Sequence, residues 1–474
     1  MNVLHISAEC YPFVKIGGLA DVVGSLPSEI KRLGNVEARV MLPKYKAIPS
    51  NYQKKMKHLT HLTVTLGDKQ NVYVGIETLK LGNILYYFID NQFYFGSREQ
   101  VYGYGDEAER FAYFQKAALA SLAYIDFFPD LIHVHDWHTG MIPLLIKSNP
   151  ELDKIKTVLS IHNLAYQGIF PIDNYQFFNI PYDGRFEFEG FINFLKCGIV
   201  SADHLSTVSH TYAEEIMTDY FGYGMQKLLK ARKNQLTGIL NGIDYKEFSP
   251  ENDPFIIHHF DIDTVKQGKM ACKEDLYKEL GVHFDLKKPM ISIISRLVSQ
   301  KGLDLVKRVF HELLESDDFV FIVLGSGEQE YVDYFSHLEN LFPNKVKKII
   351  GYSNKLAHMI YSASDFFLMP SKFEPCGLGQ IIALKYGTLP IVRETGGLVD
   401  TVSPYNEFDK TGNGFSFTSY NAHDMMYVIR YALKVFHQDK KSFDILVKNA
   451  MSADFSWTQS AKTYKKLYRQ VLKG

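Results

Sequence analysis

The chain has 474 residues, of which 46% are hydrophobic, so it is too long for one ordinary core and predicts two domains of about two hundred residues or more each. Its 52 lysines and arginines nearly cancel its 53 aspartates and glutamates, and we expect neither nucleic acid nor a membrane as its partner. Its four cysteines lie far apart with no C-x-x-C spacing, which disfavours a zinc site or a disulfide framework and is typical of a reducing compartment.

The sequence shows no pattern typical of membrane insertion or export. No apolar run approaches the roughly twenty residues that span a bilayer. The first residues form a strand-like run and do not resemble a signal peptide. We therefore expect a soluble protein of the cytoplasm.

Short β-rich runs alternate with helical patterns along the first half of the chain. Such alternation is typical of a parallel sheet covered on both faces by helices. The expected strands lie at residues 3–7, 37–43, 84–90, 130–136, 156–162 and 204–209. The expected helices lie at residues 20–33, 107–125, 139–148 and 190–201.

The pattern starts again after an irregular polar stretch that follows residue 241. We therefore place a domain boundary near residue 241 and predict an α/β fold of two doubly wound, Rossmann-like domains. Two such domains would face a central cleft, with ligands bound beyond the carboxyl ends of the strands. The expected strands of the second half lie at residues 289–296, 319–324, 347–352, 366–370 and 388–392.

The loop after the first strand has the sequence KIGGL at residues 15–19. Gly17 and Gly18 let the backbone approach an anion closely, the first N–H groups of the next helix point outward, and Lys15 adds a positive charge. This composition favours a phosphate-binding loop, although it is neither a Walker A motif nor a full G-x-G-x-x-G. The alternative is a strand-to-helix turn that simply needs glycine.

A second pair of cations follows the first strand of the second half. Arg296 and Lys301 are five positions apart in the loop that opens the next helix, where an arginine binds an anion through two parallel bonds and a lysine adds a point charge. A solvated pair of surface charges is the alternative. Because Lys15 occupies the matching edge of the first half, we expect both halves to offer phosphate-binding groups to one cleft.

Polar side chains also follow other strands of the first half. Asp136 and His162 each end a strand at the same rim of the predicted sheet, and we expect them to position a sugar or an acceptor. Hydrogen bonding that only stabilises the fold is one alternative, and a metal site is another. That metal site would use His133, His135, Asp136 and His138. Because neighbouring residues on a strand point to opposite faces of the sheet, these side chains would not all face one ion. We therefore predict no metal.

Glu374 lies between a strand of the second half and a helix whose free N–H groups come from residues 377–380. A carboxylate beside such a helix start is unfavourable unless something polar lies between them, such as sugar hydroxyls or a developing positive charge. We therefore predict a site role for Glu374. A structural N-cap is the alternative.

With these residues in place, the chain resembles the family of bacterial glycogen synthases and plant starch synthases. The matching sequence motifs occur in the same order as in the family and extend over nearly the whole chain. They are KIGGLADV at 15–22, HDWH at 135–138, HNLAYQG at 162–168, NGID at 241–244, SRL at 295–297 with QKG at 300–302, FEPCGL at 373–378, and KYGT at 385–388 with TGG at 395–397.

The resemblance implies a GT-B glycosyltransferase fold whose last helix, at about residues 457–473, returns to the first domain. The domains would be residues 1–240 plus 454–474 on the acceptor side and residues 241–453 for the nucleotide sugar. The implied reaction transfers α-glucose from ADP-glucose to the non-reducing end of glycogen or another α-1,4-glucan, with retention of configuration and release of ADP. It requires no metal or other cofactor.

The resemblance also assigns roles to residues on the nucleotide side. It implies that Lys15, Gly18, Arg296 and Lys301 bind the donor phosphates, with Gly17 beside them in the loop. Tyr352 would lie near the adenine. Backbone N–H groups at Leu378 and Gly379 would contact phosphate, since Gly379 stands where the family usually has a hydroxyl or thiol residue.

On the sugar side, the resemblance makes Glu374 the key carboxylate. It places His162 at the donor glucose and Asp136 near the reacting sugar. Together with the phosphate ligands Arg296 and Lys301, these residues form the expected catalytic set.

Overall fold

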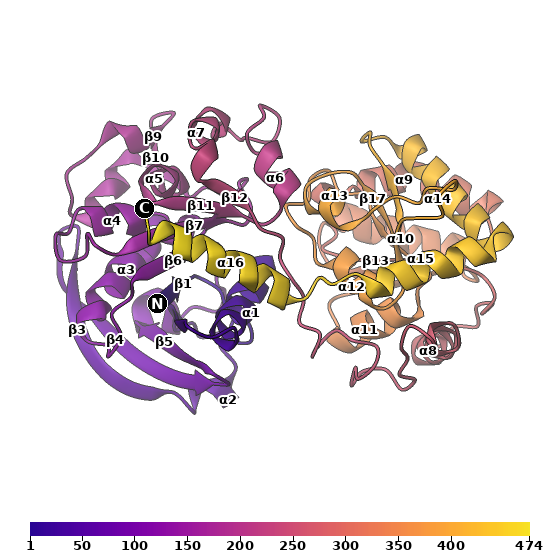
Figure 1. Ribbon diagram of the computed structural model, residues 1–474, viewed down its shortest axis with the longest axis horizontal. Coiled ribbons are helices and arrows are strands. Elements are labelled where there is room, and N and C mark those ends of the chain that lie inside the picture. Colours follow the sequence, from indigo (N-terminus) through magenta and orange to yellow (C-terminus); the bar gives the residue numbers. More distant parts are fainter. The chain divides into compact units, whose positions relative to one another are not determined.

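The computed structural model describes residues 1–474, which fold into two compact units (Figure 1). One unit comprises Met1–Asn241 together with Trp457–Gly474, and the other comprises Gly242–Ser456. Each unit has its own central sheet covered by helices. The predicted α/β fold class is confirmed. No helix in the structure has both the length and the apolar character that crossing a membrane requires.

The first unit is built on a nine-stranded sheet in the order β12-β11-β7-β6-β1-β2-β5-β4-β3. The strands from β12 to β5 pair in parallel, as the alternating pattern predicts. The strands are β1 (Asn2–Ile6), β2 (Glu37–Pro43), β3 (Lys57–Leu66), β4 (Lys69–Leu81), β5 (Ile84–Asp90), β6 (Leu131–His135), β7 (Lys156–Ile161), β11 (His204–Thr207) and β12 (Leu236–Gly238).

The antiparallel strands β3 and β4 are absent from the prediction, which expected a parallel sheet throughout. Gly67, with a φ of +62°, ends β3 at the turn into β4, and β4 pairs antiparallel with β5. The first residues of β3 and β4 are mostly exposed, so neither strand shows the apolar run that marks a buried parallel strand. A small separate sheet, β8-β10-β9, is likewise new, with strands Ile169–Pro171, Phe191–Asn193 and Glu187–Phe188.

Helices cover the main sheet of the first unit and fill its connections. Most begin within a few residues of the predicted positions, but the expected helix at 190–201 begins only at Phe194, because the preceding residues form β10. The helices are α1 (Gly18–Arg32), α2 (Ser50–Gln53), α3 (Glu107–Ala120), α4 (Ile142–Lys147), α5 (Phe194–Ser201), α6 (His210–Glu215), α7 (Gln226–Ala231) and α16 (Trp457–Val471).

The second unit has a fully parallel six-stranded sheet in the order β15-β14-β13-β16-β17-β18. Its strands are β13 (Met290–Ile294), β14 (Val320–Gly325), β15 (Val346–Ile350), β16 (Phe366–Met369), β17 (Leu389–Arg393) and β18 (Phe415–Phe417). Its helices are α8 (Val265–Leu280), α9 (Leu303–Ser316), α10 (Gln329–Leu341), α11 (Asn354–Ala363), α12 (Gly379–Lys385), α13 (Gly397–Thr401), α14 (Ala422–Gln438) and α15 (Lys440–Ser452).

Both sheets reverse their strand order at one place. In the first unit β1 lies between β2 and β6, and in the second unit β13 lies between β14 and β16. The loops that leave adjacent strands at such a switch point diverge to opposite faces and leave a crevice, where ligands of doubly wound sheets bind. The loops after β1, β6, β13 and β16 carry most of the sequence-predicted site residues.

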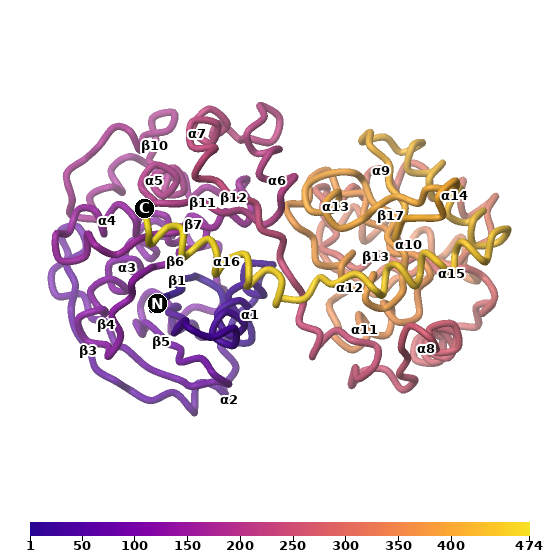
Figure 2. Tube along the Cα trace, in the orientation of Figure 1, coloured from indigo at the N-terminus to yellow at the C-terminus, as the bar shows by residue number.

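The last helix, α16, is part of the first unit's core. Trp457, Tyr464 and Tyr468 are buried in one cluster with Val22 and Leu26 of α1. Figure 2 shows the yellow α16 beside the indigo α1, in agreement with their contacts. The first unit is therefore completed by a segment that follows the whole second unit in the sequence.

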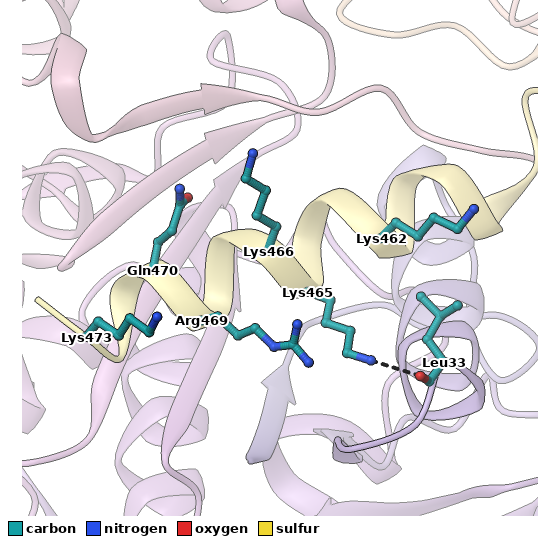
Figure 3. Close-up of a pocket in the computed structure, with 7 residues that line it drawn as sticks. All are labelled: Leu33, Lys462, Lys465, Lys466, Arg469, Gln470 and Lys473. Carbon is teal, nitrogen blue, oxygen red and sulfur yellow. Dashed lines mark hydrogen bonds between the residues drawn. The ribbon is translucent and has the colours of Figure 1, made fainter.

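The outer face of α16 is strongly cationic and contains no carboxylate. A groove of about 420 Å³ runs along it (Figure 3), and Lys465 Nζ donates a hydrogen bond to the carbonyl oxygen of Leu33 at 2.8 Å. The other cations form no ion pair within the chain. The groove is lined by Leu33, Lys462, Lys465, Lys466, Arg469, Gln470 and Lys473.

This uncompensated charge predicts the effect of a single substitution on stability. Like charges one turn apart on a helix repel by a few tenths of a kcal/mol per pair. Lys466→Glu replaces two repulsive pairs, with Lys462 and Arg469, by attractive ones, and we expect it to raise the free energy of unfolding by about 0.5 kcal/mol in low salt. Lys466→Gln is the matched control. It only removes repulsion, so its free energy of unfolding should rise by less than that of Lys466→Glu. Urea denaturation at low and high salt measures both, and a gain that high salt leaves unchanged would contradict the electrostatic origin.

Candidate functional site

The loop from β13 to α9 carries the predicted cations and is held by a close backbone contact. Gly302 has a φ of +70°, and a Cβ at this position would lie 1.9 Å from the carbonyl oxygen of Pro370. Only glycine fits such a contact in that conformation. Lys301, the residue before it, is thereby fixed against the loop that follows β16.

The loop after β17 closes on the loop after β16 in the same way. Gly396 has a φ of +47°, and a Cβ there would lie 2.1 Å from the carbonyl oxygen of Glu374. The N–H of Gly397 donates to that oxygen at 3.1 Å. The backbone of Glu374 is therefore clamped in place by its neighbour.

These contacts bring Lys301 and Glu374 together. Lys301 Nζ lies 2.6 Å from Glu374 Oε2, which also accepts a hydrogen bond from Ser371 Oγ at 3.0 Å. Both side chains are largely buried, with 18% and 9% of their surface exposed. The ion pair satisfies each charge internally, so Glu374 is better described as a partner of Lys301 than as a free N-cap.

Arg296, in contrast, is exposed at the end of β13. Its guanidinium makes no ion pair or hydrogen bond within the chain, although its backbone carbonyl accepts from Ser295 Oγ. Since Glu374 neutralises Lys301, Arg296 supplies the free positive charge of this loop. A planar guanidinium in this position is well suited to bind an anion in a bidentate manner.

The remaining predicted residues of the second unit lie around the same edge. Tyr352 follows β15, and 75% of its surface is exposed. Leu378 is the N-cap of α12, which begins at Gly379. A Cβ at Gly379 would lie 2.8 Å from the Phe367 ring, so that glycine is required by packing as well as by any ligand.

In the first unit, the loop after β1 binds a carboxylate of its own chain. Glu9 Oε2 accepts the backbone N–H groups of Ile16 at 2.7 Å and Gly17 at 3.0 Å, and Lys15 Nζ pairs with Asp21 at 2.7 Å. Glu9 is a site residue that our sequence reasoning missed. The sequence offered one indication of this role: Glu9 follows a strand closely and lies seven residues before Ile16, whose N–H it accepts.

The two glycines of this loop are not explained by the chain itself. Gly17 has a φ of −143°, which any residue adopts, and Gly18 starts α1. A Cβ at either position would meet no atom within 4 Å. Neither conformation nor packing within the first unit therefore requires glycine here.

Asp136 is held in a strained conformation at the end of β6. Its φ of 55° and ψ of −170° fall in a region that is almost restricted to glycine. The carboxylate is buried and accepts the His162 backbone N–H at 2.7 Å. Burial raises the pKa of Asp136 to about 7, the negative charge of Glu9 adds to that shift, and the backbone N–H groups of His162 and Asn163 oppose it.

His162 also contacts the strands through its ring. His162 Nε2 lies 3.0 Å from His135 Nδ1, and burial lowers the pKa of His162 to about 3, so the ring is neutral at physiological pH. The structure thus brings Asp136 and His162 together, as predicted. His138 is placed differently, since its ring stacks between Trp137 and Tyr102.

The histidines that lie close enough to share a metal ion differ from the set considered in the sequence. Ligand atoms of His5, His133 and His135 lie within 4.8 Å of one another, whereas Asp136 and His138 are outside this group. The nitrogens of His133 already bind Tyr468 Oη at 2.6 Å and Ser160 Oγ at 2.7 Å. Hydrogen bonds therefore use atoms that a metal would need.

Comparison with known proteins gives two family matches. Residues 2–231 match the family described as "Starch synthase catalytic domain", and residues 281–444 match "Glycosyl transferases group 1". The chain is 47% identical over 487 residues to a glycogen synthase of Bacillus subtilis (strain 168), covering 100% of this chain and 99% of the relative. It is 46% identical over 483 residues to a glycogen synthase of Clostridioides difficile (strain 630), covering 99% and 100%.

Solved structures agree with these matches. The catalytic domain of starch synthase IV from Arabidopsis thaliana, bound to ADP and acarbose, aligns with a TM-score of 0.92 at 32% identity and covers 100% of this chain and 99% of its own. A sucrose-phosphate synthase from Thermosynechococcus elongatus aligns with a TM-score of 0.63 at 16% identity, with the same coverage. The second likeness concerns the fold alone.

Because the pKa of Asp136 is raised, we expect Asp136→Asn to increase the free energy of unfolding by an amount that depends on pH. The folded state holds the Asp136 proton more tightly than the unfolded chain, so stability falls as the pH rises from about 4 to the folded pKa of about 7. Asparagine mimics the protonated carboxyl and can still accept the His162 N–H. We expect the variant to be more stable by about 2–4 kcal/mol at pH 8 and nearly equal at pH 4. Urea denaturation across this range measures the difference, and a gain that does not change with pH would be inconsistent with the shift.

Proposed function

Because the chain belongs to the family of glycogen synthases and starch synthases, we propose that it transfers glucose from ADP-glucose to the non-reducing end of glycogen or another α-1,4-glucan and releases ADP. The ADP and acarbose bound to the plant relative support a nucleotide site and a sugar site. The observation that carries the proposal is the loop after β13, which combines the free Arg296 guanidinium with the fixed Lys301.

Breaking the glucosyl bond leaves negative charge on the departing diphosphate. Arg296 and Lys301 bind that charge in the proposed mechanism and stabilise the leaving group without a metal ion. Backbone N–H groups at Leu378 and Gly379 add phosphate contacts. Tyr352, whose ring is mostly exposed, stacks on the adenine.

The first unit also offers groups that bind phosphate in this proposal. Gly17 and Gly18 leave space beside the start of α1 that no side chain of the unit uses, which suits close approach of a phosphate. Lys15 adds a cation.

Buried polar groups bind the sugar in this proposal. His162 binds the donor glucose, and Asp136, in its ionised form, stabilises the positive charge that develops on the reacting sugar. Glu374 fixes Lys301 and accepts sugar hydroxyls through its remaining lone pairs. Because Glu374 Oε2 is already occupied by Lys301 and Ser371, we assign it no role as a covalent nucleophile. Retention then follows from attack on the same face, with the leaving phosphate taking the acceptor's proton.

The proposed location is the cytoplasm. All four cysteines are buried and none forms a disulfide, which suits a reducing compartment. We assign residues 1–240 plus 454–474 to the acceptor side and residues 241–453 to the nucleotide sugar.

The decisive experiment measures ADP release with glycogen as the acceptor. ADP-glucose and UDP-glucose compete in the same assay, and an added chelator tests for a divalent ion. The proposal expects glucan-dependent ADP release that favours ADP-glucose and survives chelation. A preference for UDP-glucose or a small acceptor would indicate another retaining transferase, whereas glucan binding without ADP release would indicate a binding protein.

Removal of the Arg296 guanidinium tests the leaving-group role directly. We expect Arg296→Ala to lower kcat about a hundred-fold or more, because one charge-assisted contact to the departing phosphate is lost. Its exposed side chain supports no other group, so the melting temperature should not change. Arg308→Ala, in the exposed face of α9, is the matched control. Near-normal turnover of Arg296→Ala would reject this role.

A methyl group at residue 18 tests the phosphate loop. Gly18→Ala should leave the stability unchanged or slightly raised, since alanine favours helix α1 and meets no atom. It should lower kcat/KM for ADP-glucose at least ten-fold because the methyl group fills space meant for the donor. The control is Gly184→Ala, another open position of the same unit without a positive φ. Equal kcat/KM for both variants would indicate that the loop is only a strand-to-helix turn and does not bind phosphate.

A further inference from the structure

A row of three buried histidines crosses the sheet of the first unit. His5 lies on β1, His135 on β6, and His162 directly after β7, and these strands are neighbours. His5 Nδ1 lies 3.3 Å from His135 Nε2, and His135 Nδ1 lies 3.0 Å from His162 Nε2. His5 and His135 are fully buried, and 8% of His162 is exposed. Only the last ring of the row therefore reaches solvent.

Each ring in this row carries one proton. Burial lowers the pKa of His5 and His162 to about 3 and that of His135 well below its ordinary value, so all three are neutral. A neutral imidazole has one N–H donor and one bare acceptor nitrogen. The two hydrogen bonds must consequently run in the same direction, either from His5 toward His162 or from His162 toward His5.

The far end of the row decides between these directions. His5 Nε2 is buried and has no hydrogen-bond partner. If the bonds ran toward His5, this nitrogen would carry a proton with no acceptor. If they run toward His162, it is only a bare lone pair. A buried N–H without a partner is rarer and less favourable than an unused acceptor.

We propose that the row sets the proton position on His162, with His5 Nδ1–H donating to His135 Nε2 and His135 Nδ1–H donating to His162 Nε2. His162 then carries its proton on Nδ1, the nitrogen that has no partner within the chain. It presents a hydrogen-bond donor to an oxygen of the bound sugar and cannot act there as a base. His5 and His135 are positioning residues.

His133 does not take part in this row, although its ring centre lies 4.2 Å from that of His135. Both of its nitrogens are engaged, one by Tyr468 Oη and the other by Ser160 Oγ. It therefore offers His135 no competing partner. The direction of the row therefore depends on His5 alone.

The proton position is measured directly on the wild-type protein with ring-¹⁵N-labelled histidine. The His162 signals are assigned by their loss in His162→Gln. We expect a protonated, pyrrole-type Nδ1 and an unprotonated, pyridine-type Nε2 on His162. A protonated Nε2 on His162 would overturn the proposal. This measurement needs no substrate, so it is independent of the proposed reaction.

The link to the reaction, which rests on the proposed function, is tested by two substitutions of His135. Glutamine retains an N–H that can donate to His162 Nε2, whereas leucine retains the volume and no donor. We expect His135→Leu to lower kcat about ten-fold with little change in KM for ADP-glucose, and His135→Gln to recover most of that loss. A purely packing role would favour leucine.

The outcomes of these arms are distinguishable. Equal losses in both variants at unchanged melting temperature would reject the donor role of His135. If the wild-type protein transfers no glucose, the proposed function fails, while the ¹⁵N spectrum still decides the proton position. If either variant unfolds, the wild-type spectrum remains sufficient to support or overturn the assignment.

Discussion

The contact of one backbone with another at the strand ends of the second unit determines the geometry of its candidate site. Gly302 packs against the carbonyl group of Pro370, and Gly396 packs against that of Glu374. Each contact is so close that a side chain at the glycine would clash with the carbonyl oxygen. Because the sheet fixes the strands and these contacts fix the loops, the Lys301–Glu374 ion pair is formed before any ligand arrives. Such preorganisation is what electrostatic stabilisation of a transition state requires.

The first unit holds its polar groups at a cost in stability. Asp136 combines a backbone conformation that is nearly restricted to glycine with a carboxylate that is buried near Glu9. Strain and a perturbed pKa in one residue are a common mark of functional sites. The surrounding hydrogen bonds, above all the N–H of His162, keep the residue in place. The two units therefore prepare their sites differently: the second unit uses a buried ion pair, and the first uses a strained, buried carboxyl group with a raised pKa.

Much of this arrangement was accessible from sequence, because parallel strands place their following residues at one edge. That rule placed Asp136 and His162 at one rim, whereas the Lys301–Glu374 ion pair emerged only from the structure. It did not reveal Glu9, because the sequence does not show that this carboxylate accepts hydrogen bonds from the N–H groups of the predicted phosphate loop. It also missed His5, which is hidden within an apolar strand, and the hairpin of β3 and β4, whose alternating exposure lacks an apolar run.

The position of α16 has a consequence for the order of folding during synthesis. The second unit is made from one continuous segment, Gly242–Ser456, and can bury its core as soon as that segment leaves the ribosome. The first unit is synthesised earlier, yet Val22 and Leu26 lack part of their packing until Trp457, Tyr464 and Tyr468 have been added. The domain that is translated first is thus the one that finishes folding last, and it presents an open apolar face to the cell throughout the synthesis of its neighbour.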